Sequence, residues 1–417
     1  MDAQRLLDTF ITLVGIDSPS RSEARVAAFC AQQLEGLGFV VRFDGAQETT
    51  GSDTGNLIAF LPGKPEANPS VTSEASSQVK PGDNPPVSSE DNPSALPAAG
   101  LPAPYPTDAS GLPHIALSAH MDCVDPCKGV IPLVQDGVIR SSGETVLGAD
   151  DKAGIAAILE ALRTVIEEGL ARPSITVLLT TCEELSLLGA SALADDVFPA
   201  QTPCFVLDAD GSPGTIIKGA PYHYSLTAHF FGKAAHAGVA PEEGASAVQM
   251  AACAISSMRL GRLGEHATAN IGIIEGGREI NIIPDSCTLK GECRSLHQEE
   301  AKAIRDDMTQ ACKDAAQGFG GRVEVLWRLD YPGILYDECD PLIAKLSAAA
   351  RAAGVEPVLA VSGGGADTNL IAAKGARAIT LGIGMTAFHS LEEHITVKDL
   401  EDTARFVEEI VRGFTGQ

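Results

Sequence analysis

The segments HIALSAHMD (114–122) and SITVLLTTCEEL (174–185) decide the fold, because each is a short apolar run that ends in polar residues. Between them lies GADDKAGIAAILEALRTVIEEG (148–169), whose apolar residues recur at helical spacing before a glycine. A further apolar run, PCFVLDADG (203–211), follows. This strand–helix–strand alternation predicts an α/β fold built on a mixed, largely parallel sheet.

The composition and the spacing of apolar residues change in two places outside this region. Twelve of the 25 prolines lie between positions 62 and 113, and the surrounding Ser, Asn, Gly and Ala bury little apolar surface. We therefore expect a disordered Pro/Ser-rich loop at about 64–112. Alternating strands and two helices predict a smaller α+β domain at 219–330. It would be inserted between the two parts of a catalytic domain, 1–218 and 331–417.

Length, charge and cysteine content exclude several classes of protein. The 417 residues are enough for two domains, and 30 Lys and Arg against 55 Asp and Glu give a net charge of −25. Such an acidic chain repels nucleic acid and anionic membrane surfaces, so we expect neither as a partner. No apolar run reaches 18 residues, and the N-terminus does not resemble a signal peptide. Ten unpaired cysteines indicate reduced thiols, and we expect a cytoplasmic protein.

Acids and imidazoles follow the predicted strands at equivalent places. In open α/β sheets, ligands bind outside the carboxyl ends of the strands, so these side chains are expected to converge. Histidines and carboxylates without cysteine suit zinc, with cobalt or manganese as alternatives. Because there are more acids than one ion needs, we expect two divalent ions sharing one carboxylate. The residues are His120 and Asp122, Asp150 and Asp151, Glu183 and Glu184, Asp208, and His389.

Each cluster taken alone has an ordinary structural explanation. Asp150 and Asp151 could be acids at the start of a helix, and so could Glu183 and Glu184. His389 alone could be an ordinary surface or core histidine. Only the joint arrangement at one sheet edge favours a metal site.

The order of these residues resembles the dinuclear zinc peptidase superfamily, which includes tripeptidase (peptidase T), glutamate carboxypeptidase and aminoacylase. HAGVAPEEGASA (236–247), TANIGIIEGGREINIIPD (268–285) and ECRSL (292–296) are most similar to the peptidase T-like branch. The resemblance covers nearly the whole chain except the Pro/Ser-rich stretch. It implies a zinc-peptidase-type catalytic domain and an inserted lid or dimerisation domain.

The resemblance also implies roles for the clustered residues. Asp150 would bridge the two ions. His120 and Asp208 would complete one ion, and Glu184 and His389 the other. Glu183 would be the general base, and Asp122 would hold the free nitrogen of the His120 imidazole.

Three further residues match positions that contact substrate in the family, and a glycine-rich segment supplies a fourth candidate, Gly364, although this segment differs from that of peptidase T. His236 and Asn281 would stabilise an oxyanion, and Arg294 would bind a substrate carboxylate. His236 could instead be an ordinary buried histidine, and Arg294 could belong to a structural salt bridge. In SGGGADTN (362–369), Gly364 would line the substrate pocket through backbone amides, or the glycines would form a turn that needs a positive φ.

We therefore expect a metal-dependent hydrolase that cleaves an amide bond in short peptides with metal-activated water, as an aminopeptidase or tripeptidase does. An N-acyl amino acid amidohydrolase is the alternative within the enzyme class. A non-catalytic metal-dependent peptide-binding protein is the alternative outside it. The inserted domain is expected to support a homodimer.

Overall fold

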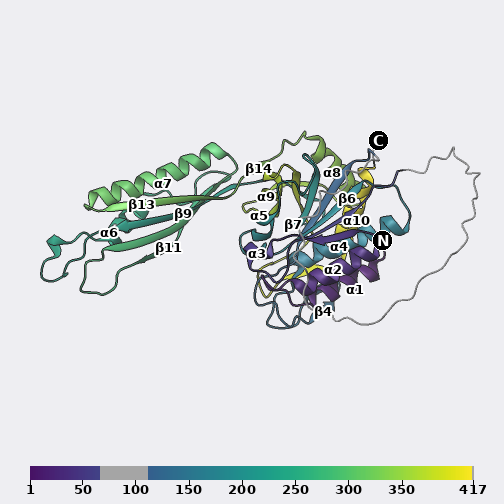
Figure 1. Ribbon diagram of the computed structural model, residues 1–417, viewed down its shortest axis with the longest axis horizontal. Helices are drawn as coiled ribbons and strands as arrows, with labels where there is room; N and C mark the ends of the chain where they lie inside the picture. Colours follow the sequence, from purple (N-terminus) through teal and green to yellow (C-terminus); the bar gives the residue numbers. More distant parts are fainter. Residues whose placement is uncertain (66–110, 416–417) are drawn as a thin grey trace, which may run out of the picture.

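A computed structural model describes residues 1–65 and 111–415 of the chain. The predicted disordered loop at 64–112 lies outside the described residues, except for its first two and last two positions. The molecule is elongated, with a large α/β body next to a smaller sheet with helices on one face (Figure 1). Within the described residues, no helix has both the length and the apolar character needed to cross a bilayer.

The large body contains a mixed sheet of nine strands, which confirms the predicted fold class. Parallel pairing is concentrated at the centre, where β6, β3, β7 and β16 lie side by side in one direction. Their carboxyl ends therefore share one edge of the sheet. The order is β1-β2-β6-β3-β7-β16-β8-β14, with β15 beside β8. The strands are β1 (Val40–Phe43), β2 (Leu57–Leu61), β3 (His114–His120), β6 (Ser174–Thr180), β7 (Pro203–Ala209), β8 (Thr215–Ala220), β14 (Ile334–Leu335), β15 (Val358–Val361) and β16 (Arg377–Gly382).

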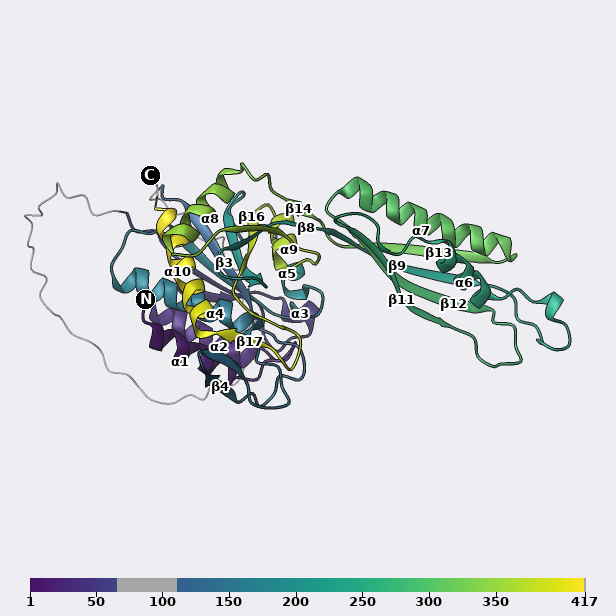
Figure 2. The same cartoon turned by 180° about the vertical axis from the view of Figure 1, so that it is seen from behind.

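Helices cover both faces of this sheet. One face packs against α1 (Ala3–Val14), α2 (Ala24–Gly36), α4 (Ala149–Glu167), α8 (Pro341–Ala352) and α10 (Val397–Gly413), which share the main hydrophobic core (Figure 2). The other face carries α3 (Gln47–Thr50), α5 (Leu188–Ala192) and α9 (Asp367–Ala373). Helix α4 is buried along nearly its whole length because its many alanines let α1, α10 and the sheet approach closely.

A small three-stranded sheet was not predicted from the sequence. It contains β4 (Pro132–Gln135), β5 (Val138–Ser141) and β17 (His394–Thr396), in the order β17-β5-β4. These strands have only three or four residues each, too few for a clear alternating pattern. Strand β17 anchors the loop that carries His389 to the large body.

The second body is a five-stranded antiparallel sheet in the order β10-β11-β12-β9-β13. Buried side chains alternate along β9 because α6 and α7 cover only one face of the sheet. The strands are β9 (Tyr222–Phe231), β10 (Gly261–Arg262), β11 (Ala267–Gly276), β12 (Ser286–Ser295) and β13 (Arg322–Tyr331). The helical elements are η1 (Pro241–Glu243), α6 (Ala247–Ser257) and α7 (Gln298–Gly318).

Candidate metal centre and substrate cleft

The predicted ligands meet at the shared edge of the central parallel strands. His120 is the last residue of β3, Asp208 lies near the end of β7, and Asp150 lies at the start of α4. Glu184 follows β6, and His389 lies in the loop after β16. Together with Glu183, most of them line a cleft of about 950 Å³; the buried His120 lies just behind it.

Asp150 occupies the centre of this arrangement. Its Oδ1 lies 3.0 Å from His120 Nε2, and its Oδ2 lies 3.2 Å from His389 Nε2. His120 Nε2 is also 3.6 Å from Asp208 Oδ1, while His389 Nε2 is 2.9 Å from Glu184 Oε1. The two oxygens of one carboxylate thus face two separate sets of donor atoms, as a carboxylate shared by two ions would require.

The chemistry of the donor set fits divalent metal ions. Ligand atoms of His120, Asp150 and Glu184 lie within 4.8 Å of one another, and so do those of His120, Asp151 and Asp208. Imidazole nitrogens and carboxylate oxygens are donors that zinc accepts. Asp151 suits a ligand role less well than Asp150, because its Oδ2 already accepts the backbone N–H of His120 at 3.1 Å.

The electrostatics of the cluster favour cations. Burial disfavours the charged imidazole of His120, but the carboxylates of Asp122, Asp150 and Asp208 raise its pKa well above the usual range. Burial also raises the pKa of Glu183 well above that of an ordinary glutamate, and the nearby Asp208 carboxylate raises it further. Carboxylates outnumber imidazoles in this cluster, so bound cations would relieve their mutual repulsion.

Asp122 contacts both His120 and the loop after β6. The Nδ1 of His120 lies 3.0 Å from the backbone oxygen of Asp122 and 3.5 Å from its Oδ1. The backbone N–H groups of Glu183 and Glu184 donate to Oδ1 and Oδ2 of Asp122, at 2.9 and 3.3 Å. Its Oδ2 also accepts the hydroxyl of Ser20 at 2.6 Å. Asp122 therefore orients one ligand and fixes the backbone of the segment that carries another.

Several buried side chains that the sequence analysis did not single out hold the same loops. Glu393 is 1% exposed and accepts the backbone N–H groups of Gly148 and Asp150, at 2.8 and 3.0 Å. Asn56 and Glu23 accept backbone N–H groups of the loop after β6. Nothing in the local sequence distinguishes such acceptors, because their partners lie more than a hundred residues away.

Two of the four predicted substrate residues lie in the cleft. Gly364 and Arg294 both line it, and Arg294 Nη2 is paired with Glu292 Oε2 at 2.8 Å. None of the glycines at 363–365 has a positive φ, so the turn explanation for them was wrong. Gly365 is required for another reason: a Cβ at this position would lie 2.4 Å from the ring of Tyr331.

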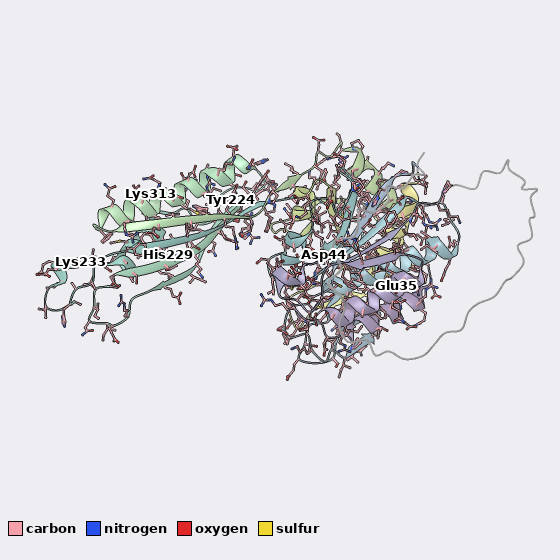
Figure 3. All side chains as sticks on the ribbon, viewed as in Figure 1. Glu35, Asp44, Tyr224, His229, Lys233 and Lys313 are labelled. Carbon is pink, nitrogen blue, oxygen red and sulfur yellow. The ribbon has the colours of Figure 1, made fainter. Side chains whose placement is uncertain are left out.

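The other two predicted substrate residues are not brought to this cleft by the same chain. His236 and Asn281 are exposed, and they lie together because the backbone N–H of Ala237 donates to the backbone oxygen of Asn281 at 2.9 Å. This region is at the end of the smaller body that is distant from the large one, near the labelled Lys233 (Figure 3).

Comparison with known proteins gives concordant matches. Residues 116–413 match the sequence model of Peptidase family M20/M25/M40. The chain is 36% identical to the uncharacterized protein YqjE of Bacillus subtilis, over 99% of this chain and 98% of that protein. Aminopeptidase PepT of Bacillus cereus has a similar structure, with a TM-score of 0.84, 34% identity and 99% of each chain covered. A tripeptidase of Staphylococcus aureus has a TM-score of 0.85 and 32% identity, with 100% of each chain covered.

Proposed function

Because this chain belongs to Peptidase family M20/M25/M40 and hydrolyses peptide amide bonds, we propose that it is an aminopeptidase acting on di- or tripeptides. The observation that carries this proposal is the shared carboxylate of Asp150, which faces two sets of donors in a substrate-sized cleft.

The size and charge of the cleft support a short peptide with free ends. A volume of about 950 Å³ lies near the upper end of the range for small-molecule sites. Carboxylates gather at the metal end, where Asp208 and Asp210 line the cleft. Arg294 and Arg328 line the side formed by the second sheet, where they are paired with Glu292 and Asp330. The acidic end suits a substrate α-amino group, and a substrate carboxylate would share the Arg294 guanidinium with Glu292.

We assign His120, Asp208 and Asp150 to one ion and Asp150, Glu184 and His389 to the other. We propose zinc because imidazole and carboxylate together are its usual donors, and cobalt or manganese could replace it. A pair of such ions supplies Lewis-acid chemistry, lowering the pKa of a water molecule and polarising the scissile carbonyl.

Glu183 is proposed as the general base. It adjoins the proposed ligand Glu184 and lines the cleft, and Asp122 holds the backbone of both residues. From this position its carboxylate would accept a proton from the water molecule and later deliver it to the leaving amine.

Residues 219–330 are proposed as an inserted lid and dimerisation domain. Ile273 and Ile274 on β11 are 48% and 50% exposed, and beyond Ala269 the outer edge of β11 pairs with no other strand within the described residues. An exposed edge with apolar side chains favours pairing with a second copy. We propose that His236 and Asn281 then reach the site of the other copy and stabilise the oxyanion there.

The ten cysteines all lie in the described residues and are free thiols, which supports a reducing compartment and hence the cytoplasm. Cys123 and Cys127, next to the site, are buried and pack with Val146.

Elemental analysis tests the metal proposal. Purified protein should hold about two divalent ions per chain, and Asp150→Ala should lose both because the two ions share this residue. Chelation should abolish activity, and zinc should restore it. Wild-type protein that is fully active without any divalent ion would overturn the proposal.

Matched substitutions separate the base from the ligand. Glu183→Gln should keep its metal yet lose about 10²–10⁴-fold in kcat, the range for general acid–base catalysis. Glu184→Gln should weaken metal binding as well. Near-normal kcat in Glu183→Gln would require another base.

Matched free and N-acetylated tripeptides test which end of the substrate is recognised. Acetylation should lower kcat/KM at least roughly tenfold, because the blocked nitrogen loses a charge-assisted hydrogen bond. Faster turnover of the acetylated peptides would instead establish an N-acyl amino acid amidohydrolase.

Mixing two inactive variants tests the homodimer. If His236 acts on the other copy, mixing Glu183→Gln with His236→Ala should restore activity, since a mixed dimer contains one intact site. Light scattering should show two chains per particle. A monomer, or a mixture as inactive as its components, would contradict the proposed arrangement.

A further inference from the structure

Glu23 is a buried carboxylate that belongs to neither proposed metal group. It directly precedes α2, where an acid is ordinarily solvated and favours the helix dipole. Here its exposed fraction is 0%, and its side chain makes no capping hydrogen bond to α2. A buried carboxylate must be matched by donors elsewhere, because desolvating it is costly.

The donors come from three separate segments of the chain. Oε1 of Glu23 accepts the backbone N–H groups of Arg21 at 2.9 Å and Cys182 at 3.0 Å. The thiol of Cys182 lies 3.3 Å from the same oxygen. Oε2 accepts the hydroxyl of Ser52 at 2.6 Å. Glu23 therefore joins the N-terminal segment to the loop after β6, 159 residues away.

This loop is held at four successive backbone N–H groups. Asn56 Oδ1 accepts that of Thr181 at 3.0 Å, Glu23 accepts that of Cys182, and Asp122 accepts those of residues 183 and 184. Cys182 has a φ of +51°, a conformation that costs a non-glycine residue free energy. The hydrogen bond to Glu23 is placed where it opposes relaxation of this strained residue.

We propose that Glu23 is a positioning residue, which fixes the loop so that the carboxylate of Glu183 is held at its working distance from the substrate. The inference rests on the proposed role of Glu183 as the base. Glu23 does not line the cleft and belongs to neither group of candidate metal ligands. Since misplacing a reacting group by about 1 Å can cost about 10²-fold in rate, releasing the backbone of Cys182 should mainly lower kcat.

Three variants separate positioning from stability. Glu23→Ala removes the acceptor. Glu23→Gln keeps an amide oxygen for the N–H of Cys182, while its amide nitrogen can donate to the hydroxyl of Ser52 after that hydroxyl rotates. Val26→Ala is the control, because Val26 is fully buried in the core side of the same helix and loses methyl groups without removing a polar contact.

In zinc-loaded full-length protein, Glu23→Ala should lose about 10²-fold in kcat with KM within about threefold of wild type. Glu23→Gln should recover most of this loss, and Val26→Ala should keep wild-type kcat. Amide hydrogen exchange should accelerate at 181–184 in Glu23→Ala but not in Val26→Ala, since local protection follows local hydrogen bonding.

Wild-type kcat in folded Glu23→Ala would overturn the proposal, as would an equal loss of kcat in Glu23→Ala and Val26→Ala. If Glu23→Ala does not fold, Glu23→Asp keeps a carboxylate that is one methylene too short, and wild-type kcat there would overturn the proposal. Glu183→Gln is measured in parallel. If that variant stays active, the base assignment fails; if it is inactive while Glu23→Ala is unaffected, only the positioning role fails.

Discussion

Gly189→Ala should displace the loop that carries the proposed base. Gly189 lies in α5 against this loop, and an added Cβ would be 2.1 Å from the backbone oxygen of Thr181. It would also lie 2.7 Å from Asn56 Oδ1 and 2.8 Å from the backbone nitrogen of Thr181. Because these two atoms form the hydrogen bond that holds the start of the loop, no small rearrangement relieves all three contacts.

The size of the expected loss in kcat follows from how far the added Cβ would push the loop. Moving the Thr181 oxygen from 2.1 Å to an acceptable 3.0 Å requires a shift of about 0.9 Å. Glu183 lies only two residues further along, so a displacement near 1 Å should lower kcat by about 10²-fold. Overpacking of this kind typically costs about 1–3 kcal/mol of stability.

The assay compares kcat and KM on a free tripeptide, with the free energy of unfolding measured by urea titration. Gly36→Ala is the matched control, because a Cβ on Gly36 in α2 would meet no atom within 4 Å. It should leave kcat unchanged and be neutral or slightly stabilising. A Gly189→Ala variant with wild-type kcat would refute the view that this loop is rigidly held.

Two further predictions concern stability. The hydrogen bond from His223 and the neighbouring Arg294 lower the pKa of Glu292 from 4.5 to about 2. The ionised Glu292 therefore stabilises the fold fully above pH 4.5, and this stabilisation is lost as the pH falls towards 2. The melting temperatures of wild type and Glu292→Gln should converge over that interval, and a difference that stays constant with pH would contradict the prediction. Arg5 binds the 1% exposed side chain of Glu160 through Nε at 2.7 Å, so Arg5→Ala should cost about 3 kcal/mol in urea unfolding. Arg259→Ala breaks an exposed ion pair with Asp307 and should cost less than about 1 kcal/mol. Equal losses of unfolding free energy in the two variants would refute the distinction between buried and exposed ion pairs.

Local sequence patterns predicted much of the fold. The helical pattern at 148–169 is observed as α4, Ala149–Glu167. The two helices and the alternating strands expected within 219–330 are observed there as α6, α7 and the strands β9 to β13. Such patterns work because an amphipathic element must turn its apolar side to the core. They failed for β4, β5 and β17, which are too short to show a period. Strands β4 and β5 form a tight hairpin with each other, and β17 joins them from a distant part of the chain.

The sequence by itself determined which residue types follow the central strands. Parallel strands have their carboxyl ends at one edge, so the convergence of His120 and Asp208 could be expected from strand order alone. Only the tertiary structure decided that Glu23 and Glu393 hold the backbone of the site, and that His236 does not line the cleft of its own chain. The physical reason is that a hydrogen bond between residues 159 positions apart depends on how whole elements pack, and local periodicity carries no information about that packing.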